Sequence, residues 1–302
     1  MPGAGPRIVV TGGTGFVGRA VCERLVERNS GSRIVVPTRR LAQGRPLQML
    51  PGLELAPCDV HDPRALAAVF DGADALVHLV AILHGSATDF NRMHVELPRK
   101  LAAACRAAGV RRVIHVSALG IAADAPSAYL RSKAGGEAVW HDSRLDVTVL
   151  RPSVIFGAED RFTNLFARLL RVFPLLPLAG AEARFQAVWV GDVASAITAC
   201  LDRPDLAGAV VECAGPDVLT LRQIVERIGR LSGHPRPVVA LPEPIGRLQA
   251  ALMGLLPGQP LMSADNLLSM RVPNIAGGMH PGLETLGIRP LGLDAMAAHF
   301  RS

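Results

Sequence analysis

The stretch VVTGGTGFVG, Val9 to Gly18, decides the fold of this chain. Before its glycines, the apolar run from Ile8 to Val10 predicts a β-strand. After them, apolar residues recur at helical spacing, at Val17, Val21 and Leu25. A strand, a tight glycine turn and a helix in this order are typical of the first unit of a dinucleotide-binding α/β domain.

The glycines of this turn match two nucleotide-binding patterns, G-x-G-x-x-G at Gly13, Gly15 and Gly18, and G-x-x-G-x-x-G at Gly12, Gly15 and Gly18. Glycine permits the tight turn, lets a pyrophosphate approach the backbone and lets the helix pack on the strand, while the helix N-terminus offers N–H groups to phosphate. A plain glycine turn is the alternative, but the position at the first strand-to-helix junction favours a dinucleotide. We therefore predict cofactor contacts at Gly12, Gly13, Thr14, Gly15, Phe16, Val17 and Gly18.

Composition limits the class of protein. The 302 residues can form one large or two modest domains, and 49% of them are hydrophobic, which is enough for a substantial core. The net charge of +6 comes mostly from scattered arginines, and without a basic tract or a stacked aromatic pattern we predict no nucleic-acid partner. The five cysteines are dispersed, which predicts reduced core residues and no metal site.

Two further features bear on location. The sequence has no run of about 18 uncharged apolar residues, so we predict no membrane-spanning helix. Met1 to Arg7 leads directly into the first strand, which predicts that there is no signal peptide. We expect a cytoplasmic protein, with peripheral contact to the inner membrane as an open alternative.

Strands and helices alternate along the first half of the chain. After the first strand, we predict strands at Ile34–Pro37, Leu53–Pro57, Ala75–Val80, Val113–Ser117 and Val147–Leu150. We predict helices at Asp62–Phe70, Val95–Ala108 and Tyr129–His141. This alternation predicts an α/β fold with a doubly wound parallel sheet, the Rossmann architecture.

Ligands of such sheets bind beyond the carboxyl ends of the strands, which selects a further set of cofactor contacts. These are Thr38, Arg39, Arg40, Asp59, Val60, Ala81 and Pro152. The end of the second strand has two arginines and no carboxylate, which favours the 2′-phosphate of NADP(H) over NAD(H), with a solvated basic loop as the alternative. Asp59 fits either the adenine amino group or a turn-capping role.

Tyr129 and Lys133 are the candidate catalytic pair. Four residues apart, they lie on one face of the predicted helix, where an ammonium group stabilises a phenolate. A phenol can donate or remove a proton at a carbonyl or alcohol, and Ser117 can hydrogen-bond the same substrate oxygen. The alternative is an incidental Tyr/Lys pair, but Tyr129 is the only tyrosine of the chain and follows Ser117 by twelve residues.

With these motifs, the chain resembles the short-chain dehydrogenase/reductase superfamily, in its extended and atypical, epimerase/dehydratase-like branches. Three longer segments, HVSALG at 115–120, AYLRSKAGGE at 128–137 and LRPSVIFG at 150–157, resemble bacterial relatives of the nucleotide-binding accessory subunit of respiratory complex I. AEDRF at 158–162 and VWVGDVA at 188–194 continue the resemblance, which covers almost the whole chain.

The resemblance implies a Rossmann domain at 1–157 and 187–215 and a small, discontinuous substrate or partner domain at 158–186 and 216–302. It implies an oxidoreductase or epimerase-like enzyme acting on a carbonyl or alcohol of a sugar nucleotide. The Leu, Met and Pro content of the C-terminal part instead favours an apolar carbonyl or a quinone. The alternative is a non-catalytic NADPH-binding accessory or sensor protein of complex I or quinone metabolism, because atypical members often keep the dinucleotide and lose catalysis. His94 lies where the superfamily often has a supporting asparagine, and we interpret it as an ordinary helix residue.

The second half contains two apolar segments that we predict to be helical. They are Phe162–Leu178, with Arg168 and Arg171 and with Pro174 and Pro177 to end the helix, and Ile245–Leu256. We expect one of two arrangements: either both segments pack inward around a substrate pocket, or both form a contact with a partner or a membrane surface. Between and around them we predict strands at Val188–Val193, Gly208–Ala214 and Val238–Leu241, and helices at Val193–Leu201 and Leu219–Leu231.

Overall fold

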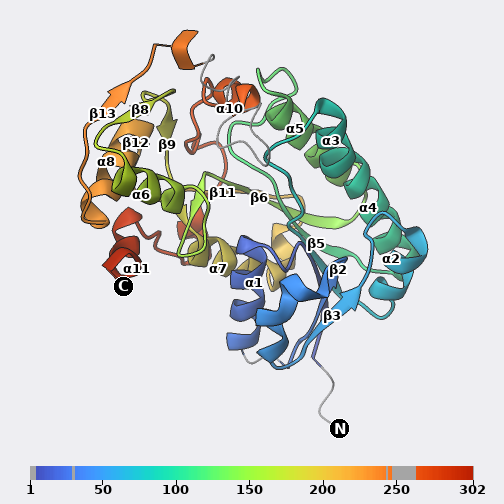
Figure 1. Cartoon of the computed structure of the whole chain (residues 1–302). Helices are drawn as coiled ribbons and strands as arrows, with labels where there is room; N and C mark the ends of the chain where they lie inside the picture. The colour runs from blue at the N-terminus through green and yellow to red at the C-terminus, as the bar shows by residue number, and fades with distance from the viewer. Residues whose placement is uncertain (1–4, 29–30, 243, 247–262, 302) are drawn as a thin grey trace.

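A computed structural model describes residues 5–28, 31–242, 244–246 and 263–301. Its main sheet has seven parallel strands in the order β11-β6-β5-β4-β1-β2-β3 (Figure 1). These strands are β1 (Arg7–Thr11), β2 (Arg33–Thr38), β3 (Leu53–Pro57), β4 (Ala75–His78), β5 (Arg112–Val116), β6 (Asp146–Pro152) and β11 (Val210–Cys213). The order reverses direction between β1 and β4, which is the topological switch point of a doubly wound sheet. The predicted fold class is confirmed.

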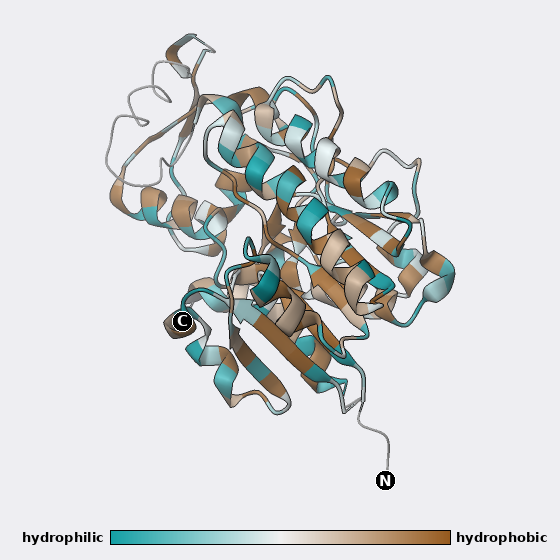
Figure 2. Ribbon diagram, turned by 90° about the vertical axis from the view of Figure 1, so that its right-hand side faces the viewer, coloured by the Kyte–Doolittle hydropathy of each residue, from teal (hydrophilic) through white to brown (hydrophobic). Residues whose placement is uncertain are grey.

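Helices cover both faces of this sheet. One face carries α1 (Phe16–Glu27) and α7 (Val190–Leu201), and the other carries α2 (Pro63–Phe70), α4 (Leu97–Ala108) and α5 (Ala128–His141). Alternate residues of a strand point to opposite faces, so in β1 Val10 joins the core under α1 while Val9 joins the core under α2 and α4. The strands are correspondingly hydrophobic along most of their length (Figure 2).

A third core lies outside the two faces of the main sheet. It packs α6 (Thr163–Val172) against α8 (Leu221–Leu231), with Phe156, Phe166 and Leu170 among its buried residues. Three two-stranded sheets accompany it, made of β7 (Ile155–Phe156) with β10 (Val188–Trp189), β9 (Arg184–Phe185) with β12 (Leu219–Thr220), and β8 (Leu176–Leu178) with β13 (Val238–Ala240).

The remaining described elements are short helices. They are η1 (Leu41–Met49), α3 (Ala87–Asn91), the π-helical turn η2 (Arg92–Glu96), η3 (Pro204–Leu206), α10 (Ala264–Ser269), η4 (Leu283–Leu286), η5 (Leu293–Met296) and α11 (Ala297–Arg301). In the described part of the chain, no helix is long and apolar enough to cross a membrane. All five cysteines are free and buried, as predicted.

Three predictions for the second half need correction or fall outside the structure. The helix predicted at Phe162–Leu178 ends at Val172, because the residue before Pro174 is driven to an extended conformation, and residues 176–178 form β8 instead. The strand predicted at Val188–Val193 is only Val188–Trp189, and it pairs with β7 outside the main sheet while α7 begins at Val190. Residues 247–256 of the predicted helix Ile245–Leu256 lie outside the described residues.

Candidate functional site

The glycine turn joins β1 to α1 at the centre of the carboxyl edge of the sheet. Gly12 has a φ of +80°, which an L side chain rarely adopts. A Cβ atom at Gly18 would lie 2.3 Å from the Gly12 carbonyl oxygen and 2.5 Å from Gly13 Cα. A glycine at position 18 is therefore what lets the helix pack directly on the turn.

The N-terminus of α1 is built to receive an anion. Its N-cap residue is Gly15, which has no side chain to accept the first N–H groups of the helix. No acidic residue lies in the first turn. The free N–H groups and the positive end of the helix dipole fit a dinucleotide pyrophosphate.

The strand ends beside this turn carry the other predicted cofactor contacts. Arg39 and Arg40 are exposed after β2, where the Thr38 hydroxyl accepts a hydrogen bond from the Arg40 N–H (3.2 Å). Asp59 after β3 accepts from the His61 N–H (3.0 Å), and this bond lowers the pKa of the Asp59 carboxyl. The turn-capping role of Asp59 is thus present, and the adenine role stays a prediction. Pro152 is the last residue of β6, and Val60 and Ala81 lie in the loops that follow β3 and β4.

Ser117 directly follows β5, and Tyr129 and Lys133 both lie in α5, whose Lys133 side chain reaches the end of β5. Lys133 is buried, and its Nζ donates to the carbonyl oxygen of Val116, the residue before Ser117 (2.8 Å). The Ser117 hydroxyl is buried and has no hydrogen-bond partner among the described residues. Since a buried hydroxyl ordinarily has a partner, this orphaned group fits a site that a substrate oxygen completes.

The electrostatics of this group come mainly from burial. Desolvation raises the pKa of Tyr129 to about 12, although part of the residue remains exposed. Desolvation lowers the pKa of Lys133 to about 8, while the nearby Glu137 carboxylate acts in the opposite direction. Glu137 itself is paired with Arg151, whose Nε donates to Glu137 Oε2 (3.1 Å). At neutral pH the phenol therefore carries its proton, and most of the lysine is charged.

His94 was not predicted as part of the site. It lies in the π-helical turn η2, a type of distortion frequent at functional sites. Its Nε2 accepts from the Ile82 N–H (3.1 Å), so its Nδ1 carries the proton and donates to Ser132 Oγ (2.8 Å). Burial, and secondarily the charge of Lys133, lower the pKa of His94 to about 3, so the ring is neutral. This histidine therefore links the loop after β4 to α5.

Two more buried histidines lie behind the site. His78 of β4 and His115 of β5 are paired in register and stack with ring centroids 5.3 Å apart. His78 Nδ1 is hydrogen-bonded to the Thr11 hydroxyl (2.8 Å), and burial lowers the pKa of both rings. Nothing in the sequence predicts this pair, because the two residues are far apart in the chain and are neighbours only through the order of the strands.

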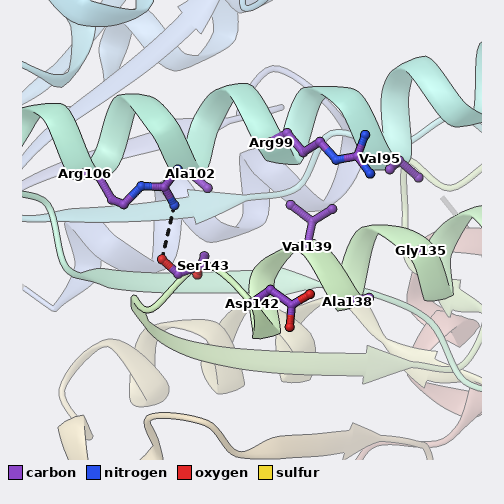
Figure 3. A pocket seen from close by; sticks show the side chains of 9 residues that line it. All are labelled: Val95, Arg99, Ala102, Arg106, Gly135, Ala138, Val139, Asp142 and Ser143. Atoms are coloured by element: carbon purple, nitrogen blue, oxygen red, sulfur yellow. Dashed lines mark hydrogen bonds between the residues drawn. The ribbon is translucent and has the colours of Figure 1, made fainter.

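Two hollows of the described structure lie away from these residues. One of about 490 Å³ runs between α4 and α5, with Arg99 and Arg106 on one wall and Asp142 on the other (Figure 3). Another of about 420 Å³ lies beside α6. Neither is lined by a predicted site residue. No group of residues in the described part of the chain has the arrangement of a metal site.

Residues 8–214 match the NAD dependent epimerase/dehydratase family. The chain belongs to this family. Family membership supports a nicotinamide dinucleotide as the cofactor and confirms the resemblance inferred from the motifs.

Among its relatives in this family is a mouse protein, NADH dehydrogenase [ubiquinone] 1 alpha subcomplex subunit 9, mitochondrial. It is 31% identical over 292 residues, which cover 94% of this chain and 77% of the mouse protein. The ceramide reductase of Caulobacter vibrioides is 27% identical over 238 residues, 78% of this chain and 74% of that protein. The NADPH-dependent quinone oxidoreductase of Escherichia coli, solved with NADPH, shares the fold with a TM-score of 0.80, at 22% identity and with 98% and 100% of the two chains covered.

Proposed function

We propose that this protein is an NADP(H)-binding oxidoreductase or epimerase-like enzyme of the short-chain dehydrogenase/reductase type, acting on a carbonyl or alcohol. The observation that carries the proposal is the buried, unpartnered Ser117 hydroxyl beside the Lys133–Val116 contact. Tyr129 lies one helical turn before Lys133, so the three groups can act on one substrate oxygen.

Each residue has a distinct role in this proposal. A bound nicotinamide supplies or accepts the hydride. Ser117 Oγ donates a hydrogen bond that orients the substrate oxygen, and Tyr129 delivers a proton to that oxygen or removes one from it. Because burial holds the Tyr129 phenol in its protonated form at neutral pH, the arrangement favours proton delivery to a carbonyl. Lys133 stabilises the phenolate left behind and, in this proposal, contacts the cofactor ribose.

The preference for NADP(H) is a second part of the proposal. Arg39 and Arg40 are both exposed after β2, where arginine accommodates a ribose 2′-phosphate. Arginine suits this role because its planar guanidinium donates several hydrogen bonds to phosphate oxygens. Thr38, whose hydroxyl caps the Arg40 N–H, would fix the start of this loop.

We propose an apolar carbonyl as the substrate, with a sugar nucleotide as the second choice. The similarity to a ceramide reductase supports a lipid-like carbonyl. Most of the third core, including Phe166, Leu170 and Ile224, belongs to the segments that we propose as the substrate domain, 158–186 and 216–302, and Phe156 and Ala187 join it from the dinucleotide domain.

The test is an NADPH oxidation assay with lipid-like ketones, quinones and sugar-nucleotide ketones in parallel. For a substrate that is turned over, Tyr129→Phe is expected to abolish turnover while NADPH affinity, measured by calorimetry, stays unchanged. A Tyr129→Phe variant that keeps full activity on that substrate would show that the phenol is not the acid/base.

A second candidate function is a non-catalytic, NADPH-bound accessory role at a respiratory complex. The similarity to the mouse complex I subunit over 94% of this chain favours it. Native electrophoresis of membranes from the host distinguishes the two functions. Comigration of the protein with a respiratory complex, together with no turnover of any tested carbonyl, favours the accessory role, and a free protein with turnover favours the enzyme.

A further inference from the structure

The first turn of α5, which carries Tyr129, is held by a carboxylate from a distant part of the chain. Asp265 Oδ1 accepts from the Ala128 N–H (2.7 Å), and its Oδ2 accepts from the Tyr129 N–H (3.1 Å). Asp265 belongs to α10, which lies beside the beginning of α5 in Figure 1. Both oxygens of one side chain therefore bind consecutive N–H groups at the start of α5.

This contact adds to a cap that α5 already has. Ser127 is the N-cap residue, and its Oγ accepts from the Leu130 N–H (3.1 Å). Ser127 alone leaves the N–H groups of Ala128 and Tyr129 without an intrahelical acceptor. Asp265 satisfies both, so the first turn is complete only when the C-terminal segment is docked.

The same segment also ties down the loop after β6. We call residues 263–282 the strap. Within it, Asn274 Oδ1 accepts from the Ser153 hydroxyl (2.7 Å) and from the Val154 N–H (2.8 Å). The Asn274 Nδ2 lies 3.4 Å from the Leu119 carbonyl oxygen, two residues beyond Ser117. The strap thus contacts α5 and the segments that follow β5 and β6.

We propose that Asp265 is a positioning residue for Tyr129, through which the strap holds the phenol in the site. The Tyr129 ring lies edge-on to His94, with ring centroids 5.6 Å apart, and edge-on to Phe90 at 6.0 Å. Since the Tyr129 N–H is bound to Asp265, the backbone of this residue cannot move away from those rings while the strap is docked. The acid/base role of Tyr129 rests on the proposed function, but its positioning by Asp265 does not.

Removal of Asp265 leaves two N–H groups at the start of α5 without their acceptor. The first turn then opens more often, and each opening exposes the phenol to water. The opening frequency is expected to rise about fivefold, because losing a helix cap usually costs about 1 kcal/mol. Tyr129 reports this directly, because it is the only tyrosine in the chain.

The experiment is nitration of the full-length protein with tetranitromethane at mildly alkaline pH, followed by mass spectrometry of the peptide that contains Tyr129. Asp265→Ala is expected to nitrate about five times faster than the wild type. Asp265→Asn keeps a single acceptor oxygen, so its rate is expected to fall between the two. The matched control is Asp62→Ala, which removes an aspartate that caps α2 through the Arg64 N–H (2.9 Å), far from Tyr129.

The outcomes separate a positioning role from a general loss of stability. Faster nitration in the Asp265 variants with a wild-type rate in Asp62→Ala supports the proposal. Wild-type rates in folded Asp265→Ala or Asp265→Asn overturn it, and so does an equal acceleration in Asp62→Ala. If Asp265→Ala does not fold, Asp265→Asn decides. Because nitration needs neither substrate nor turnover, a failure of the proposed function, seen as an active Tyr129→Phe, is distinguishable from a failure here.

Discussion

The burial of Lys133 can be tested quantitatively, because transferring its ammonium group from water into the protein interior opposes folding. Its pKa falls from the ordinary 10.5 to about 8 in the folded protein. In the unfolded chain the amine keeps its proton up to the higher pH, so the folded state binds fewer protons between these two values. Stability due to this group therefore rises with pH across that window, and the burial cost at pH 7 is about 3 kcal/mol.

Replacing Lys133 with Met removes that cost and the ammonium together. The Val116 carbonyl loses a hydrogen bond worth about 1 kcal/mol, so the variant is expected to be about 2 kcal/mol more stable at pH 7. Between pH 7 and 10 the wild type is expected to gain about 2 kcal/mol relative to Lys133→Met. The same substitution is expected to abolish turnover, because the Tyr129 phenolate loses its neighbouring charge.

Urea unfolding of both proteins at several pH values measures this difference. Comparing the two proteins is necessary because other groups also make the free energy of unfolding depend on pH. Burial raises the pKa values of Cys22 and Cys213, so their contribution to the stability of the folded protein falls as the pH increases. Lys100 is the only other lysine and is exposed, so Lys100→Met serves as the control and is expected to keep the wild-type pH dependence. Parallel pH profiles for the wild type and Lys133→Met would refute the reasoning.

Three further predictions concern the cofactor and the surface. Gly18→Ala places a Cβ atom 2.3 Å from the Gly12 carbonyl oxygen, and this variant is expected to bind NADPH about tenfold or more weakly in calorimetry. The control is Gly277→Ala, whose Cβ atom meets only a side-chain oxygen at 3.4 Å and which is expected to bind NADPH normally. Arg39→Ser combined with Arg40→Ser is expected to weaken NADPH binding about tenfold and leave NADH binding unchanged, and an equal loss for both would contradict the phosphate role. Val172, Phe173 and Leu175 are exposed at the end of α6, so the wild-type protein is expected to float with anionic vesicles and Phe173→Glu is expected to remain unbound. A wild-type protein that stays in solution at low salt would exclude the membrane contact.

The choice of Phe173 follows from the packing of α6. Both accounts of Phe162–Leu178 were open from the sequence, since periodicity shows an apolar face but not what covers it. The structure buries Phe166 and Leu170 against α8, so most of the apolar face packs inward. The exposed apolar residues Val172, Phe173 and Leu175 lie at and just beyond the C-terminal end of the helix. The apolar face was predicted correctly, and of the two prolines predicted to end the helix it is Pro174 that does so.

The fold and the position of the candidate cofactor site could be predicted because they depend on local sequence patterns. Glycine spacing at Gly13, Gly15 and Gly18 marks the phosphate turn, and strand ends in a parallel sheet share one edge. The contacts that shape the catalytic group are not local. His94 in η2 is hydrogen-bonded to Ser132 in α5, and Asp265 is hydrogen-bonded to Tyr129, from which it is separated by 136 positions in the sequence. Neither has a sequence signature, because each depends on how helices pack and not on spacing.

The central claim is that the glycine turn of β1 and α1 binds a nicotinamide dinucleotide, with the arginines after β2 selecting the phosphorylated form. Calorimetric titration of the full chain with NADPH and with NADH in parallel tests this most directly. The account predicts saturable binding of both, with NADPH the tighter by about tenfold. Equal or tighter binding of NADH would contradict the role of Arg39 and Arg40, and no binding of either dinucleotide would contradict the claim itself.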